Sequence, residues 1–510
     1  MVRKCNTSGA TPTVCVQKGW YAKRCQRGPA SACLPFRSSK ITDSLELALE
    51  LAAVASTGGV RMRVYDRFAG AWSGRVPPTA KALVTAVTVG LLAYGLSYLA
   101  SLVIARALGA SVFGAYAGVT SVLTLTSAFV FLGKDVAISR FLPTYVEQKD
   151  LATCSGYLRH AIKGIAIAGA AVFVIGILVL IYLNFRTGEQ LTHIKQTHPI
   201  YFFIWAVPAM MAFTYTTNYL FDIGYPNFYL VLTSAVFPIL IVVGLTTFAF
   251  FFHRFSISEA LIIYCCALLV TAGIAFGFSS VKTPLAKIWR TAPKYDMQRW
   301  RRVTRQLFIM AISTWYPTSL LLILMTAFSN DRQETGLVAA VLSIAGVMFA
   351  SQNAIFVVAA PRLAMAIADH NPQKLRQVVL GSTCTNLLVS GLFFIMMLVW
   401  GKGWLGHFGS EFSAAYPTLV ILGATVLALS GVSTIASTLE QSSLLKNYSY
   451  FSVAATLAYI VFTAVFQHMS GGRAPVYGFV LMSAASIIYL CAVAPQALRI
   501  ADATPQLPPK

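Results

Sequence analysis

Long apolar stretches dominate this chain of 510 residues and constrain its fold more than any other feature. A helix needs about 20 mostly apolar residues to cross the roughly 30 Å hydrocarbon core of a bilayer. Backbone groups inside lipid must be hydrogen-bonded within their own segment, so each such stretch is expected to be a helix. Twelve stretches meet this criterion: 82–104, 113–132, 160–182, 199–221, 227–252, 257–279, 306–328, 335–360, 378–400, 415–438, 448–468 and 475–495. The sequence therefore predicts an all-α polytopic membrane protein with about 12 transmembrane helices.

Lysine and arginine are distributed unevenly between the two sides of these predicted spans. Of the 39 Lys and Arg residues, 32 lie before the first span, in the even-numbered connections or in the C-terminal tail, with Lys163 counted in the connection after the second span. Cytoplasmic segments carry an excess of these residues, so both termini are expected in the cytoplasm. The net charge of +22 reflects 39 Lys and Arg residues against 17 Asp and Glu residues, and most of these cations lie on one side of the predicted spans. Membrane lipid is therefore the expected partner of the positive charge, and nucleic acid is not.

An internal repeat divides the chain into two halves. At an offset of 222 residues (336 minus 114), segment 114–140 aligns without gaps with segment 336–362. Six spans in each copy keep both copies in the same orientation, and transporters built this way bind substrate between their halves. The two predicted lobes are residues 82–279 and 306–495, joined by a basic cytoplasmic linker at 280–305. Before the first lobe, residues 1–61 are predicted to be an N-terminal extension that is either disordered or precedes the true start, and residues 62–81 a basic cytoplasmic lead-in. Residues 496–510 are predicted to be a cytoplasmic tail.

Polar and aromatic side chains within the spans are candidate contacts for a polar substrate, because polar groups in lipid are costly unless they face a cavity or a partner. The predicted cavity-lining set is Tyr94, Tyr98, Asn218, Trp315, Tyr316, Gln352 and Asn353. Hydrogen bonding between helices is the alternative role for the amides. Packing or anchoring at the membrane interface is the alternative role for the aromatic residues.

A charged stretch follows the second span and contains Lys134, Asp135 and Arg140. Helical periodicity places neighbours such as Phe141 toward lipid or protein, and the three charged residues toward water at the cytoplasmic boundary. In the repeat alignment Arg140 is equivalent to Arg362. A guanidinium group binds phosphate through two parallel hydrogen bonds, so the pair is a candidate phosphate site. Anchoring of the helices to anionic lipid headgroups is the alternative.

Catalysis and metal binding are not predicted. The longest connection on the outer side, 184–199, contains one acidic residue, Glu189. The sequence has no glycine-rich loop followed by Lys and Ser or Thr, as ATP-hydrolysing proteins have. Its nine cysteines fit no compact zinc-binding spacing, so neither a metal nor another cofactor is expected.

Several segments resemble a known family. Segments 105–118, 133–150, 334–377 and 406–431, the last of which contains the motif "FGSEF" at 408–412, resemble the O-antigen type of polysaccharide (oligosaccharide) flippases of the MOP (multidrug/oligosaccharidyl-lipid/polysaccharide) superfamily. The resemblance extends over residues 80–495. It implies a two-lobed, MATE-like fold that opens alternately to the two sides of the membrane.

The resemblance also implies a function and a site. Such a transporter flips undecaprenyl-pyrophosphate-linked oligosaccharide units across the bacterial inner membrane for O-antigen, exopolysaccharide or capsule biosynthesis. Coupling to a proton or sodium gradient is implied, as are a polysaccharide polymerase and chain-length machinery as partners. The candidate contacts to the substrate headgroup are Arg106, Lys134, Asp135, Arg140 and Arg362. The alternatives are a cation-coupled multidrug antiporter of the same superfamily and, from a different class, a membrane glycosyltransferase or polysaccharide polymerase.

Overall fold

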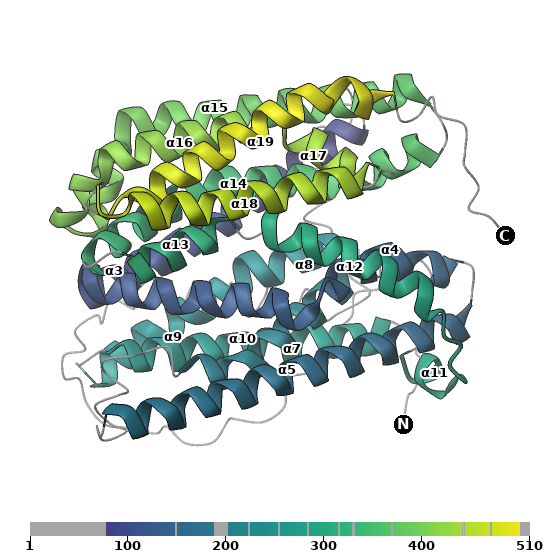
Figure 1. The fold of residues 1–510 in the computed structure, drawn as a ribbon, viewed down its shortest axis with the longest axis horizontal. Helices are drawn as coiled ribbons and strands as arrows, with labels where there is room; N and C mark the ends of the chain where they lie inside the picture. The colour runs from purple at the N-terminus through teal and green to yellow at the C-terminus, as the bar shows by residue number, and fades with distance from the viewer. Residues whose placement is uncertain are drawn as a thin grey trace, which may run out of the picture. The chain divides into compact units, whose positions relative to one another are not determined.

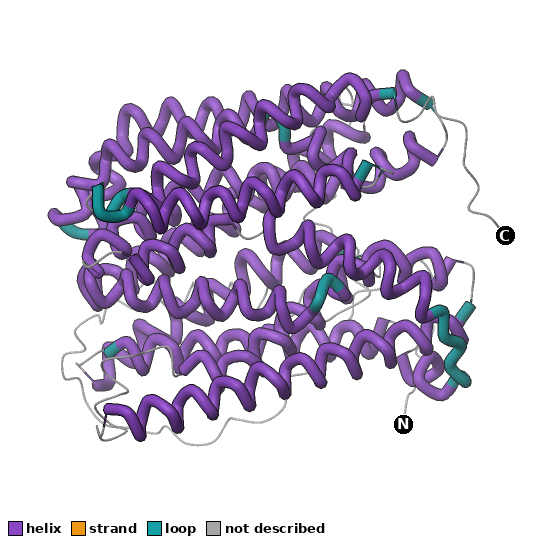
Figure 2. The backbone as a smooth tube through the Cα atoms, viewed as in Figure 1, coloured by secondary structure: helices purple, strands orange, loops and turns teal. Residues whose placement is uncertain are grey.

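The computed structural model of the chain describes residues 78–147, 150–187, 202–222, 225–252, 256–282, 285–314, 317–328, 332–368, 371–440, 442, 444–469 and 472–499. Helix forms nearly all of this part of the chain, and none of it is strand, which confirms the predicted fold class (Figure 2). The predicted extension at 1–61 and most of the lead-in at 62–81 lie outside the described residues. So do Trp315, Tyr316 and the end of the predicted tail.

The helices follow one another with short connections. In chain order they are α3 (Pro78–Phe131), α4 (Lys134–Glu147), α5 (Leu151–Thr187), α7 (Phe202–Asp222), α8 (Pro226–Val231), the π-helix η2 (Leu232–Val236), α9 (Phe237–Phe252), α10 (Ile257–Lys282), α11 (Leu285–Arg290), α12 (Met297–Thr314), α13 (Pro317–Phe328), α14 (Arg332–Ala368), α15 (Pro372–Phe408), the 3₁₀-helix η3 (Ser410–Ala415), α16 (Tyr416–Ser430), α17 (Ser433–Glu440), α18 (Leu445–Phe466) and α19 (Ala474–Leu498). Each of the twelve predicted spans coincides with one of these helices or with consecutive ones. Within the described residues, nine helical stretches are long and apolar enough to cross a membrane.

The number of membrane-spanning stretches is lower than the number of predicted spans partly because two predicted spans form one helix and another is divided between two helices. The spans predicted at 82–104 and 113–132 both lie in α3, whose backbone leaves helical geometry at Gly109 (φ 75°, ψ 167°). Glycine has no Cβ, so it adopts a positive φ that other residues avoid, and the chain changes direction there. The span predicted at 306–328 is divided between α12 and α13, because Pro317, which has no backbone N–H, begins α13.

The helices of each half pack mainly on one another. In the first half α7 packs on α10 and α5, and in the second half α14 packs on α15 and α16 while α18 packs on α19 (Figure 1). Between the halves, the most extensive contact joins α3 with α14. The packing therefore follows the two copies of the predicted repeat.

Two glycines that the repeat alignment makes equivalent bring the α3 and α14 backbones into contact. A Cβ on Gly114 would lie 2.6 Å from the backbone nitrogen of Gly336, and a Cβ on Gly336 would overlap the carbonyl oxygen of Ala110. Small residues permit such close approach, and membrane helices rely on it because burying apolar surface gains little where lipid already surrounds the helices. The internal repeat thus has its two copies joined at equivalent residues.

We expect Gly336→Ala to destabilise the protein by about 1–3 kcal/mol, because the added methyl group meets backbone atoms that cannot rotate away. Thermal unfolding of the purified protein in detergent measures the change. The matched control is Gly381→Ala on α15, where a Cβ would meet nothing within 4 Å. That control is expected to leave stability unchanged or slightly raised, because alanine favours helix over glycine. Equal unfolding temperatures for Gly336→Ala and the wild type would contradict the close crossing.

A partly buried acidic residue ends α17. Leu439, the residue before Glu440, is fully buried in an apolar cluster that also contains Trp300 of α12 and Tyr448 of α18. Burial disfavours the charged carboxylate and raises the pKa of Glu440 from 4.5 to about 8. Folding therefore takes up a proton at this residue between these two pH values.

Because the folded state binds this proton more tightly than the unfolded state does, stability falls as the pH rises from about 4.5 to 8. Glu440→Gln removes the titrating group and keeps its shape. The variant's gain in unfolding temperature over the wild type should therefore be larger at pH 9 than at pH 5.5. Differential scanning fluorimetry at the two pH values tests this, and a gain independent of pH would argue against the raised pKa.

Candidate functional site

A sharp turn between α3 and α4 begins the first candidate site. Leu132 (φ 51°) and Gly133 (φ 73°) both adopt left-handed backbone angles between the two helices. A Cβ on Gly133 would lie 2.5 Å from the backbone nitrogen of Phe308 and 2.6 Å from the carbonyl oxygen of Thr304, both on α12. Only glycine fits this turn against α12. The equivalent stretch of the second copy, around Ile355, lies within the unbroken α14.

The turn directs Lys134 into the protein rather than toward water. The sequence predicted that Lys134 and Asp135 face water, but their exposed fractions are 8% and 9%. A Cβ on Gly164 of α5 would overlap the ammonium group of Lys134, so the missing side chain at Gly164 provides the space that this group occupies. The Tyr157 hydroxyl donates a hydrogen bond to the Lys134 carbonyl oxygen (3.4 Å). Burial lowers the pKa of the Lys134 ammonium group.

Trp300 at the start of α12 packs against Tyr157 and His160 of α5. Its side chain is fully buried, and its indole N–H donates to the Tyr145 hydroxyl at 3.0 Å. The imidazole ring of His160 stacks on the indole, with ring centroids 5.7 Å apart. Helix α12 begins at Met297, nine residues before the predicted span. Two features support this earlier start: the buried Trp300 side chain, and the Asp296 carboxylate, which accepts a hydrogen bond from the Arg299 backbone N–H.

Positive charge collects around Trp300. Lys134 and Arg301 both act electrostatically on His160, and the Arg299 guanidinium group lies 5.8 Å from the centroid of the Phe141 ring. Arg299 and Arg301 are exposed. We refer to Lys134, His160, Arg299 and Arg301 as the basic cluster. Cations and N–H donors arranged in this way suit a phosphate or pyrophosphate group, for which arginine supplies paired donors and lysine a point charge.

The repeat-related arginines lie on the two equivalent helical segments. Arg140 is on α4, which follows the turn at Gly133, and its side chain is outside what the structure describes. Arg362 is half-buried on α14, next to the fully buried Leu363. Their proposed contact with a headgroup remains a prediction.

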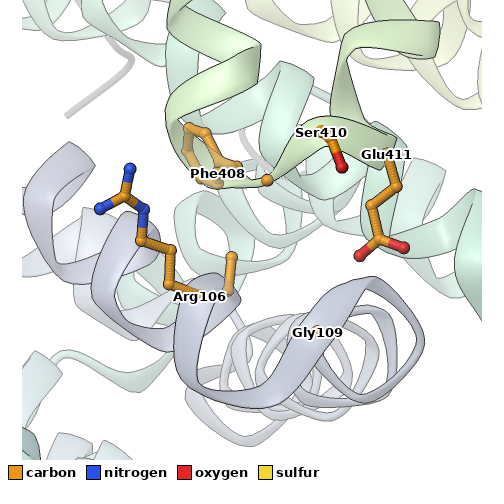
Figure 3. Close-up of a pocket in the computed structure, with 7 residues that line it drawn as sticks. Arg106, Gly109, Phe408, Ser410 and Glu411 are labelled. Carbon is orange, nitrogen blue, oxygen red and sulfur yellow. The ribbon is translucent and has the colours of Figure 1, made fainter.

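Arg106 lies far from the basic cluster. The helical segment of α3 from Ala110 to Phe131 separates them, and its 22 residues span about 33 Å. Arg106 lines a separate pocket of about 400 Å³ together with Phe408, Ser410 and Glu411 (Figure 3). The structure therefore places Lys134 and Arg106 beyond opposite ends of the Ala110–Phe131 segment of α3, which we call the Lys134 end and the Arg106 end.

Two of the predicted cavity-lining tyrosines contact the second half directly. The Tyr94 hydroxyl lies against the backbone of Gly346 on α14, where a Cβ would overlap it. The Tyr98 hydroxyl donates to the carbonyl oxygen of Trp404 (3.4 Å), and its ring meets that of Phe408 edge-on at 5.4 Å. Both side chains thus form part of the contact between α3 and the helices α14 and α15.

The predicted amides have different surroundings. The Gln352 side-chain amide donates to the Ser430 hydroxyl at 2.6 Å, and the Ser430 hydroxyl lies 2.9 Å from that of Ser390. This chain of hydrogen bonds joins α14, α16 and α15, which is the helix-to-helix role weighed for Gln352 from the sequence. Asn353 is exposed, and Asn218 is half-buried on α7.

Sequence reasoning missed His160, Trp300, Arg301 and Glu411. Trp300 and Arg301 lie within the segment 280–305, which reads as a polar linker because its eight Lys and Arg residues outnumber its buried apolar residues, Ile288 and Trp300. His160 is a lone histidine at the start of a predicted span. Glu411 did carry a signal, since it is the acidic residue of the motif at 408–412.

Comparisons with known proteins agree with this architecture. Residues 80–331 match the family described as "Polysaccharide biosynthesis protein". No protein with a curated description matches the chain in sequence.

Solved structures of transporters share the fold. An inward-facing multidrug resistance MATE family transporter of the MOP superfamily is similar with a TM-score of 0.63 and 11% identity, over 83% of this chain and 100% of that one. An outward-facing structure of such a transporter has a TM-score of 0.62 and 12% identity, over 83% and 97% of the two chains.

A MOP superfamily transporter from Pyrococcus furiosus, for which the reverse polarity of the binding pocket suggests a different function, has a TM-score of 0.59 and 12% identity, over 84% of this chain and 97% of that one. The two-lobed fold expected from the resemblance is therefore present. Residues 80–331 thus match the polysaccharide biosynthesis protein family, and the chain has the fold of the MATE transporters of the MOP superfamily.

Proposed function

We propose that this transporter flips oligosaccharide units linked to undecaprenyl pyrophosphate from the inner to the outer leaflet of the bacterial inner membrane, by alternating access. The match of residues 80–331 to a polysaccharide biosynthesis family supports a saccharide substrate. The observation that carries the proposal is the basic cluster, which joins α4 and α5 of the first half to α12. The products of this transport would serve O-antigen, exopolysaccharide or capsule biosynthesis.

The Lys134 end is the cytoplasmic end in this proposal. It contains the segment 280–305, with eight Lys and Arg residues and one acidic residue, Asp296. Loops rich in Lys and Arg stay on the cytoplasmic side, where lipid-linked units are expected to enter. Both chain termini are then cytoplasmic as well.

The chemistry of the headgroup suits this end. A pyrophosphate carries at least two negative charges and cannot cross hydrocarbon without compensation. Exposed Arg299 and Arg301 can make paired hydrogen bonds to its oxygens, and the buried Lys134 supplies charge from beneath. A ligand held there contacts both halves, so its binding favours one arrangement of the halves over the other.

Further parts of the proposal concern energy and partners. A proton or sodium gradient drives the cycle, and the chain itself performs no chemical conversion of its substrate. A polysaccharide polymerase and chain-length machinery receive the flipped units on the outer side. These partners and the coupling to an ion gradient can be tested in the same proteoliposomes that are used to measure transport.

Transport of a fluorescent lipid-linked oligosaccharide into proteoliposomes tests the proposal. We expect Lys134→Met and Arg301→Gln each to lower the initial rate at least about tenfold, since hydrogen bonds to charged groups contribute about 1.5–3 kcal/mol. Lys134→Met keeps the side-chain volume and removes a buried charge, so its unfolding temperature should not fall. The matched control is Lys402→Gln, which removes one exposed cation from α15.

Three outcomes would argue against the proposed function or favour one of its alternatives. Wild-type transport rates in both cluster variants would remove the basic cluster from the substrate path. Absence of lipid-linked oligosaccharide transport by the wild type, with exchange of a cationic dye for protons or sodium, would instead favour the multidrug antiporter. Normal arrival of the lipid-linked unit at the outer leaflet of a deletion strain, without polymerisation, would favour the polymerase class.

A further inference from the structure

Two breaks in helical backbone meet at the Arg106 end. Gly109 (φ 75°) interrupts α3, and Gly409 (φ 154°) separates α15 from η3. The helical segment that starts at Ala110 has free N–H groups in its first turn, and the end of α15 has free carbonyl groups in its last turn. Figure 3 shows the side chains of Arg106 and Glu411 in the space between these two segments.

Glu411 caps the helical segment that begins after Gly109. Its Oε1 accepts a hydrogen bond from the backbone N–H of Ala110 at 3.0 Å, and its Oε2 lies 3.5 Å from the side-chain nitrogen of Gln333 at the start of α14. A carboxylate stabilises a helix N-terminus because the aligned peptide dipoles make that end positive. One acidic side chain of the second half therefore supports the start of a helical segment in the first half.

Arg106 makes the reverse contact. Its Nε–H donates to the carbonyl oxygen of His407 in the last turn of α15. A cation at a helix C-terminus is favoured by the opposite end of the dipole. Each side of the junction thus places a charge of the favourable sign on a helix end of the other side. We call this pair of contacts the reciprocal cap.

An aromatic cluster closes the junction beneath the reciprocal cap. The Phe408 ring contacts Tyr98 (5.4 Å), Phe113 (6.4 Å) and Phe412 (5.6 Å), measured between ring centroids. Phe113, Phe408 and Phe412 are each at most 3% exposed. The motif at 408–412 therefore supplies both the charge and two of the rings that join the halves at this end.

We propose that the reciprocal cap holds the Arg106 end of the transporter closed and that Glu411 is its principal positioning residue. Alternating access requires the halves to separate at one end while they close at the other. The cap is made in the closed state and broken in the open state. The inference rests on alternating access within the proposed function and does not depend on the identity of the substrate.

Electron–electron double resonance in nanodiscs tests this directly. Spin labels at Ser111 and Ala414, both exposed, report the distance between the two sides of the junction in the full-length protein. We expect Glu411→Ala to raise the ratio of the separated to the joined population about tenfold, the change that the loss of one charged hydrogen bond produces. Glu411→Gln keeps an acceptor without the charge and should give a smaller shift.

A charge swap distinguishes capping from a simple ion pair. In Arg106→Glu/Glu411→Arg, both charges of the junction are kept and their positions are exchanged, so a junction held by attraction between the two charges would recover the joined population. The reciprocal cap instead puts each charge at the wrong helix end, so the separated population should be at least as large as in Glu411→Ala. Glu334→Ala is the matched control, because Glu334 pairs with Arg473 (3.8 Å) within the second half.

An unchanged distance distribution in Glu411→Ala, or recovery in the swapped variant, would overturn the inference. Unfolding temperatures of all variants are measured in parallel, and Glu411→Gln provides a second variant if Glu411→Ala does not fold. The substrate proposal is tested by a different experiment, the transport assay. If the wild type does not transport lipid-linked oligosaccharide, the distance change in Glu411→Ala still decides whether the reciprocal cap holds the Arg106 end closed.

Discussion

Direct contact between the backbones of α3 and α14 is the constraint on which the remaining structure depends. In a bilayer, apolar helix surface contacts lipid before the helices associate, so the gain from association comes from close packing. Glycine at positions 114 and 336 allows this close packing because it has no side chain. Once these helices cross there, Tyr94 reaches Gly346 and the break at Gly109 meets the one at Gly409. The crossing thereby fixes which helix ends of the two halves face each other.

The two ends of the Ala110–Phe131 segment of α3 use charge in different ways. At the Arg106 end, each charged side chain is matched by a helix terminus, so the charges are satisfied within the protein. At the Lys134 end, the buried ammonium group of Lys134 and the exposed guanidinium group of Arg301 both act on His160, whose imidazole ring stacks on Trp300. In the proposed function, an anionic headgroup binds these cations. The charges at the two ends therefore have different partners: helix termini at the Arg106 end and, in the proposal, the substrate at the Lys134 end.

The sequence was sufficient to predict the spans and the repeat, because apolar runs of about 20 residues are long-range signals that need no knowledge of neighbours. It could not predict that Lys134 is buried, since that depends on the absence of a side chain at Gly164 on another helix. Trp300 was not predicted to be buried because the charged residues around it make segment 280–305 look like a polar linker. The partner of Gln352, Ser430, lies 78 residues away, and helical periodicity says nothing about such distant pairs.

The turn at Leu132 and Gly133 has a mechanical consequence. In the second copy, α14 is one rod of 37 residues, which carries any rotation at the crossing directly to its far end. In the first copy, the equivalent rod is jointed, and the 14-residue α4 beyond the joint is held by α5, α7 and α12 instead. The two equivalent segments therefore have different stiffness, and the jointed one carries Lys134 of the basic cluster.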